Sequence, residues 1–405
     1  MCLSGIPQRS EQAARACAIA LGFSIPVSVA LDNVLLVLTL LFWMASLNFR
    51  KLTQIRQNPV ALAALGMFAL LVAGLAYGAR DPGDGLHMLG KYADLAFIPV
   101  FITLFDDAKV RRQAWLALAV AMVLTLVLSC LIWAALLPRG DLFVSGQRDA
   151  SVFKKSLTHN LLMAFAVFLF LYLGRSAQAG LHRRIWFTLA AVACTNVVFM
   201  SEGKTGQIVL SALVVYFVLV SLRRKAATFT LLGITLVAPL LVLGTSNPLH
   251  RAIDDWKSWR SGNVAATSTG ERLEFYRNSL NIAVAHPLFG TGTGSFQKVY
   301  ADHVSGSAVE ATDNPHNEYL NITVQLGGVG LLMLSYLFFC EWRLAVMLPT
   351  AHETHLARGL VITLLLGCLF NSLLMDHVEG LFFAWASGVL FAGLKPPLIS
   401  KAQVS

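Results

Sequence analysis

The stretch "LALAVAMVLTLVLSCLIWAALL", from Leu116 to Leu137, decides the fold class of this chain. It contains no charged residue, and a helix of this length is long enough to cross a hydrocarbon core about 30 Å thick. The stretch does not alternate apolar and polar residues, as the strands of a membrane β-barrel do. It therefore indicates a membrane-spanning α-helix.

The composition extends this interpretation to the whole chain. Of its 405 residues, 56% are hydrophobic and only 13% are charged, and the mean hydropathy is +0.66. Soluble domains carry about 25% charged residues. Because similar apolar runs recur along the chain, we predict an all-α polytopic membrane protein with about twelve transmembrane helices. The predicted spans begin near Ala16, Asn33, Pro59, Lys91, Gln113, Leu157, Ile185, Gln207, Ala227, Tyr319, Gly359 and Val378.

The positions of lysine and arginine predict the orientation. Basic residues gather in alternate loops, and cytoplasmic loops carry them in excess. An even number of spans then puts both termini in the cytoplasm of a Gram-negative cell, with the opposite loops in the periplasm and the spans in the inner membrane. The loops expected in the cytoplasm hold Arg50, Lys51, Arg56, Lys109, Arg111, Arg112, Arg175, Arg183, Arg184, Arg223, Arg224, Lys225, Arg343 and Arg358.

A long outward loop divides the predicted spans. Residues 1–244 hold the first nine spans, residues 245–318 form the loop, and residues 319–405 hold the last three spans and a cytoplasmic tail. Loops of this length are usually functional or disordered. Since "HRAIDDWKSWRSG" and "GERLEFYRNSLNIAVAHPLFG" repeat apolar residues at helical spacing, we predict a small helical cap on the membrane surface. The alternative is an ordinary surface loop with interfacial tryptophans.

The stretch "TDNPHNEYL" places a histidine where this loop enters the tenth span. Asn314 is the predicted N-cap and Pro315 the first helical residue, so His316 would lie in the first helical turn. Free backbone N–H groups and the helix dipole there favour a bound anion and a neutral imidazole. These properties suit a general base. The alternative is a polar residue that only marks the water interface.

Several basic residues are also predicted to face outward. Arg272 and Arg277 lie in "TGERLEFYRNS", and a guanidinium fork suits phosphate oxygens, although solvated surface pairing is the alternative. Lys204 lies in "FMSEGKTGQIVL", a turn so short that the lysine is expected to face the bundle or a water-filled cavity. The other candidates are Arg80, Lys91 and Arg148. Outward positive charges oppose the usual bias, and a lipid pyrophosphate would hold them there.

Other chemistries find no support in the sequence. "FGTGTGSF", from Phe289 to Phe296, follows a helical segment and lacks a P-loop lysine, so we predict a close-packed turn rather than a nucleotide site. No metal-binding pattern is present, and we expect no metal, no cofactor and no nucleic-acid partner. The six cysteines show no metal or disulfide spacing.

These pieces in this order resemble the O-antigen ligase and polymerase superfamily, and most of all its ligases. The resemblance is carried by the turn with Ser201 and Lys204, by "ERLEFYRNSLNIAVAHPLFGTGTGSF" and by "PHNEYLNITVQLGGVG". It implies a metal-independent, inverting glycosyltransferase in contact with membrane lipids. Such an enzyme moves O-antigen glycan from undecaprenyl diphosphate to the lipid A–core oligosaccharide.

The resemblance also implies roles for individual residues. His316 matches the family histidine that deprotonates the acceptor hydroxyl, and Arg272 matches the arginine that engages the diphosphate. Lys204 stands where many members have arginine, which keeps the charge but loses the bidentate fork. Asn317 and Tyr319 complete the HNxYL pattern as supporting residues. Two cations and one base suffice for displacement of a diphosphate.

Alternative functions share much of this pattern. An O-antigen polymerase or a protein O-oligosaccharyltransferase would use the same donor, so the donor-handling motifs do not separate them from a ligase. A secondary transporter of an anionic solute would show internal repeats and charges near the middle of the membrane. The charges of this chain cluster at the outward ends of spans, which favours surface chemistry.

Overall fold

The structure is a computed structural model of the chain. It describes residues 6–46, 50–78, 82–137, 149–223, 268–307 and 309–394, with isolated positions at 225, 226, 228 and 257. Within these residues every regular element is a helix, which confirms the predicted all-α class. The elements are α1 (Ile6–Ser24), α2 (Val29–Ala45), α3 (Arg50–Gln57), α4 (Pro59–Gly74), α5 (Pro82–Lys91), α6 (Asp94–Leu104), α7 (Ala108–Trp133), α8 (Ser156–Ser176), α9 (Leu181–Thr195), η1 (Asn196–Met200), α10 (Lys204–Ser221), α13 (Ser268–Ala285), α14 (Phe296–Val304), α15 (Glu318–Leu344), η3 (Ala345–Met347), α16 (Ala351–Gly367) and α17 (His377–Phe391).

Four of the described helices are long and apolar enough to cross a membrane: α7, α8, α10 and the continuous segment Glu318–Met347. A fifth span results if α3 and α4, which meet at 83°, count as one broken helix. Helices α2 and α17 are shorter apolar helices. The count of twelve spans stays a prediction, and the predicted ninth span near Ala227 lies almost entirely outside the described residues.

Helix α17 lies in the centre of the aromatic core. Its Trp385 is fully buried and meets Trp115 of α7 edge-on, with ring centroids 5.4 Å apart. The indole Nε1–H donates to the backbone carbonyl of Ala18 in α1 at 2.8 Å. A buried indole N–H needs such a partner, so this bond fixes α17 against α1 as well as α7.

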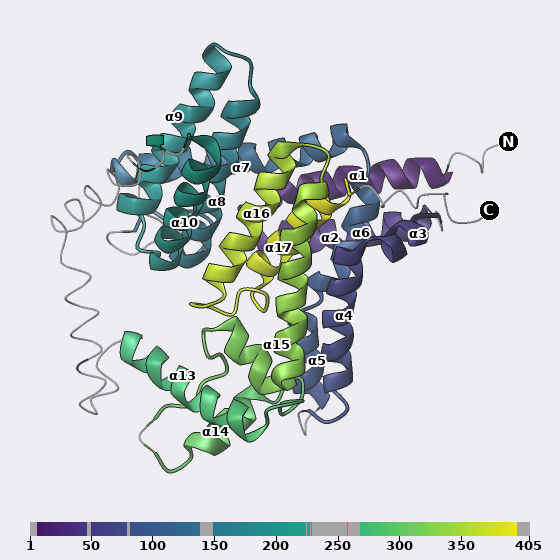
Figure 1. Ribbon diagram of the computed structural model, residues 1–405, viewed down its shortest axis with the longest axis vertical. Helices are drawn as coiled ribbons and strands as arrows, with labels where there is room; N and C mark the ends of the chain where they lie inside the picture. Colours follow the sequence, from purple (N-terminus) through teal and green to yellow (C-terminus); the bar gives the residue numbers. More distant parts are fainter. Residues whose placement is uncertain are drawn as a thin grey trace.

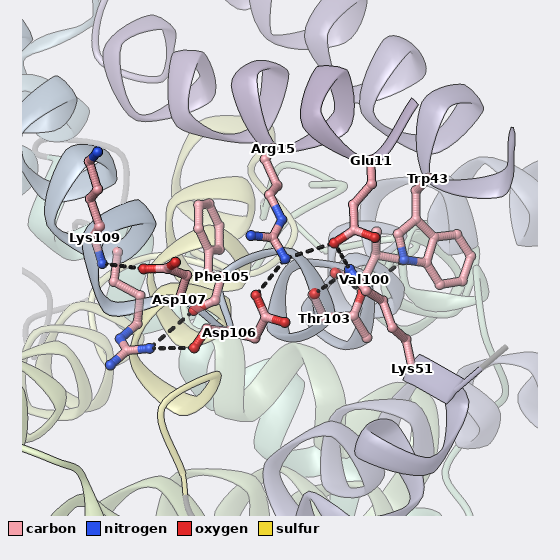
Figure 2. A network of polar contacts seen from close by, with 11 residues as sticks. Glu11, Arg15, Trp43, Lys51, Val100, Thr103, Phe105, Asp106, Asp107 and Lys109 are labelled. Carbon is pink, nitrogen blue, oxygen red and sulfur yellow. Dashed lines mark hydrogen bonds and ion pairs between the residues drawn. The ribbon is translucent and has the colours of Figure 1, made fainter. Parts of the chain in front are cut away.

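A network of ion pairs and hydrogen bonds connects the helices at one end of the bundle (Figure 2). Lys51 of α3 lies 2.8 Å from the carboxylate of Glu11 in α1 and donates to the carbonyl of Thr103 in α6. Arg15 contacts both Glu11 and Asp106 at 2.7 Å. Because a buried ammonium group requires paired and hydrogen-bonded neighbours, these contacts hold α1, α3 and the α6–α7 connection together.

Helix α15 runs from the end that carries α13 and α14 toward the end that carries α1 (Figure 1). It is broken at Gly327, whose φ of 63° and ψ of −159° are not helical. Residues 286–294 pack into this break, where the N–H of Gly328 donates to the carbonyl of Pro287 at 2.8 Å. The inserted segment therefore satisfies backbone groups that the break leaves without helical partners.

The glycines of "FGTGTGSF" form the predicted close-packed turn. Gly290, Gly292 and Gly294 all have positive φ, between 67° and 90°. A Cβ atom on Gly292 would lie 2.1 Å from the Cα of Gly78, so only glycine fits. The turn therefore packs residues 286–294 directly against the end of α4.

Helices α13 and α14 lie in the predicted outward loop, at the same end of α15 (Figure 1). Together with Val324 of α15 they form a small apolar core, to which they contribute Phe275, Ile282, Ala283, Phe296, Tyr300 and Val304. On the outer side of α13, Leu280 and Val284 are exposed. The stretch "HRAIDDWKSWRSG" lies outside the described residues apart from Lys257, so the full helical cap stays a prediction.

Candidate functional site

His316 lies before helix α15 and not in its first turn, so the predicted helix start was wrong. The helix begins at Glu318, and Asn317 is its N-cap, with its side-chain oxygen accepting from the N–H of Leu320 at 3.1 Å. The φ of His316 is 52°, in the left-handed region, which cannot continue a right-handed helix.

Asn314, the predicted cap, serves a different purpose. Its side-chain oxygen accepts from the N–H of His316 at 2.8 Å, which closes an Asx turn over residues 314–316. The same oxygen accepts from the hydroxyl of Ser372 at 2.8 Å. The turn is thereby tied to the α16–α17 connection, and it presents the half-buried His316 side chain ahead of the helix.

The imidazole of His316 is held by an amide. Its Nδ1 lies 3.0 Å from Oδ1 of Asn371. The Nδ2 of Asn371 donates to Oδ2 of Asp376 at 2.7 Å, which directs the amide oxygen toward His316. An amide oxygen only accepts, so Nδ1 carries a proton in this arrangement, and in the neutral imidazole Nε2 keeps its lone pair. This is the tautomer that a general base needs.

Several positively charged side chains act on Asp376. It is the N-cap residue of α17 and is half-buried. Burial raises the pKa of Asp376, whereas the hydrogen bond from Asn371 and the positive charges of Lys91, of Lys155 and of His316 when it is protonated act in the opposite direction. Lys91 and Lys155 therefore lie close enough to Asp376 for their charges to act on it.

Glu318 fixes the loop that carries Asn371. Its carboxylate is fully buried and accepts from the hydroxyl of Tyr92 at 2.6 Å and from the N–H of Leu374 at 3.0 Å. The N–H of Glu318 donates to the carbonyl of Cys368 at 2.8 Å. Both ends of the segment 368–374 are therefore attached to the first residue of α15, which sets where Asn371 meets His316.

Helix α13 contacts the site through Tyr276. Its Oη lies 3.1 Å from the backbone oxygens of His316 and Leu369. Burial raises the pKa of Tyr276, and the charge of Arg272, one turn earlier, opposes that rise. The guanidinium of Arg272 therefore lies near Tyr276, and the structure brings Arg272 to the side of α13 that contacts the His316 turn.

Lys204 is placed at the same bundle end but not in contact with His316. It is the exposed first residue of α10. The turn before it packs against α8, since Asn160 donates to the carbonyl of Gly203 at 2.7 Å. A Cβ atom on Gly203 would lie 2.5 Å from the carbonyl oxygen of Ser156, which directly follows Lys155. Among the described residues, no hydrogen bond or ion pair joins Lys204 to His316.

The remaining predicted residues have different environments. Arg277 is exposed and lies 3.9 Å from the carboxylate of Glu274, so the structure does not bring it to His316. Asn317 and Tyr319 attach the start of α15 to the end of α16, by donating to the carbonyls of Leu369 and Leu365 at 3.0 and 2.9 Å. Arg80 and Arg148 lie outside the described residues.

Sequence reasoning did not select Asn371 and Asp376. They lie in "FNSLLMDHVEG", a short polar interruption between two predicted spans. The available signal was an amide and a carboxylate at the predicted outward ends of neighbouring predicted spans. Across the described ranges, no group of three or more His, Cys, Asp or Glu residues is arranged to hold a metal ion.

A comparison with protein families matches the region that holds three of the predicted site residues. Residues 189–335 match the family described as O-antigen ligase. The matched region contains Lys204, Arg272 and His316 and ends before Asn371 and Asp376. No curated protein matches the chain.

Proposed function

We propose that the chain is an O-antigen ligase, on the premise that residues 189–335 match the family described as O-antigen ligase. It transfers O-antigen glycan from undecaprenyl diphosphate to the lipid A–core oligosaccharide. The reaction takes place at the periplasmic face of the inner membrane, and both chain termini lie in the cytoplasm. It is a metal-independent glycosyl transfer that inverts the anomeric centre.

The contact between His316 and Asn371 carries the proposal. With Nδ1 donating to the amide, Nε2 accepts the proton of the acceptor hydroxyl as the hydroxyl oxygen attacks C1 of the donor sugar. The bond between C1 and the diphosphate oxygen breaks, and its electrons leave with undecaprenyl diphosphate. The attack comes from the face opposite the leaving group, so the anomeric configuration inverts.

Asp376 supports the charged form of the base. When Nε2 takes a proton, the imidazole becomes an imidazolium, and the nearby carboxylate stabilises it through the intervening amide of Asn371. Asn371 and Asp376 are thus positioning residues, since neither is required to touch the donor or the acceptor.

The cations at this bundle end neutralise the leaving group. Arg272 offers a guanidinium fork to the diphosphate oxygens, and Lys204 and Lys91 offer point charges. With three positive side chains available, the developing charge on the diphosphate is met without a divalent cation. Arg80, Arg148 and Arg277 are further candidates for contacts with the donor along the outward surface.

The test is genetic and uses the lipopolysaccharide pattern on gels. The gene is deleted in its host and complemented with the wild type, His316→Ala, Arg272→Ala or His303→Ala, where His303 is an exposed histidine of α14 and serves as the matched control. For a ligase, deletion removes the O-chain ladder while polymerised lipid-linked donor accumulates. The wild type and His303→Ala restore the ladder, and the other two variants do not.

Two results would contradict the proposal. Single repeat units on the core with no polymerised donor would identify a polymerase. Full complementation by His316→Ala would exclude His316 as the base, and immunoblots of each variant would establish that the proteins are present at equal levels.

A further inference from the structure

A second cluster of polar side chains lies at the far end of α8 and α15 from His316. It consists of Tyr172 and Arg175 of α8, Tyr216 of α10, and His355 and Arg358 of α16, and we name it the arginine–tyrosine cluster. The Tyr216 hydroxyl lies 2.9 Å from Nδ1 of His355, and the Tyr172 ring stacks on the same imidazole at 5.2 Å. Three helices therefore converge on one histidine.

The two arginines of this cluster have no carboxylate partner among the described residues. Arg358 lies over the ring of Trp342 at 5.1 Å, and Arg175 lies over the ring of Phe217 at 5.8 Å. Both guanidinium charges act on the imidazole of His355. Aromatic faces stabilise the cations without neutralising them, so two positive charges remain available on either side of His355.

Nearby acidic residues do not compensate these charges. Glu353 is the only acidic residue in the sequence of α16, and its carboxylate lies 2.8 Å from Nε of Arg111. It also accepts from the hydroxyl of Thr350 at 3.0 Å. With Glu353 already engaged, the cluster keeps its positive charge.

Unsatisfied buried atoms provide an independent indication of a ligand. Tyr172 is 3% exposed, and its hydroxyl has no hydrogen-bond partner in the described structure. The buried Nε of Arg358 likewise has none. Since buried polar groups are nearly always hydrogen-bonded, the Tyr172 hydroxyl and the Arg358 Nε–H, both without partners in one cluster, indicate that an acceptor binds there.

We infer that the arginine–tyrosine cluster binds a phosphate group, carried either by an anionic phospholipid or by free phosphate. A phosphate offers acceptor oxygens to both guanidinium groups and to the Tyr172 hydroxyl. Under the orientation predicted from the sequence, this end faces the inner leaflet, where anionic headgroups lie level with interfacial tryptophan and tyrosine side chains. The inference does not depend on the proposed glycosyl transfer.

The test measures lipid binding by native mass spectrometry of the full chain in detergent. Phosphatidylglycerol and phosphatidylcholine with identical acyl chains are compared, and inorganic phosphate is added as a competitor. The double variant Arg175→Gln/Arg358→Gln is matched by Arg183→Gln/Arg184→Gln, which removes two exposed arginines from the same end of the bundle. Each cluster arginine is expected to contribute roughly fivefold to the preference for the anionic lipid.

The expected result is preferential binding of phosphatidylglycerol that falls about 25-fold in the cluster variant and remains in the matched control. Displacement by millimolar inorganic phosphate would identify free phosphate as the ligand, whereas retention would identify the lipid. Equal binding of both lipids with no effect of phosphate would overturn the inference, and so would equal losses in the two double variants. Tyr172→Phe provides a milder variant that keeps the ring packing, and it should weaken binding even where the double variant folds poorly.

Discussion

The Nδ1 atom of His316 lies 3.0 Å from Oδ1 of Asn371, although 55 residues separate them in the chain. The amide of Asn371 is itself held by Asp376, and the loop that carries it is held by Glu318. This relationship selects the imidazole tautomer and leaves Nε2 free to accept a proton. It orients the imidazole at the helix entrance, as the proposed general base requires.

Replacing Asn371 with alanine should lower the ligation rate about 10- to 100-fold, as for other residues that orient a functional imidazole. His316 would keep its imidazole but would lose the Asn371 oxygen, the acceptor that fixes the tautomer. The measurement is ligation of purified donor and acceptor in vitro. Asn278→Ala is the control, because it removes a buried amide of α13 that bonds Tyr300 and not His316. Equal losses in both variants would indicate a general structural effect instead.

Asp376→Asn should lower the activity without lowering the stability. Burial raises the pKa of Asp376 in the folded protein, so folding favours its protonated form. Its contribution to stability is therefore present at acid pH and is lost as the pH rises through the raised value. The carboxylate that supports the imidazolium forms in the same interval, so ligation should rise with pH.

For Asp376→Asn we expect lower activity at neutral pH and a flatter acid limb in the pH–rate profile. The variant should be at least as thermostable as the wild type at neutral pH, because a neutral amide does not carry the cost of a buried charge. A variant that loses stability but keeps the wild-type pH profile would show that Asp376 has only a structural role.

Lys204→Ala should raise the KM for the lipid-linked donor about 10- to 100-fold, the effect of losing one hydrogen bond to a charged group. Lys204→Arg should keep the KM at or below the wild-type value, since arginine adds the fork that suits phosphate oxygens. Lys298→Ala provides the control, because this exposed lysine of α14 pairs with Asp302 instead. An unchanged KM in Lys204→Ala would remove Lys204 from the donor site.

Gly292→Ala should destabilise the protein far more than Gly306→Ala. Both glycines have a left-handed φ, 90° and 80°, which costs alanine about 1–2 kcal/mol. At Gly306 a Cβ atom meets nothing within 4 Å, whereas at Gly292 it would lie 2.1 Å from the Cα of Gly78. Thermal unfolding in detergent measures the difference. Similar melting temperatures for the two variants would mean that the turn does not pack against α4.

Local patterns in the sequence determined several features of this protein. The apolar stretch that begins at Leu116 lies largely within α7, because a backbone in a membrane must satisfy its hydrogen bonds within the helix. The glycines from Gly290 to Gly294 indicated a tight turn, since positive φ is a property of single residues. Lys204, Arg272 and His316 were selected from short sequence motifs, and all three fall in the matched family region.

The tertiary structure alone decided how the site is assembled. Asn314 and Pro315 have the local pattern of a helix start, but Asn314 instead bonds Ser372 and the His316 backbone, so α15 begins at Glu318. Asn371 reaches His316 only because Glu318 holds the α16–α17 connection against α15. Such contacts depend on how distant helices pack, and no periodicity or capping rule within a short window encodes them.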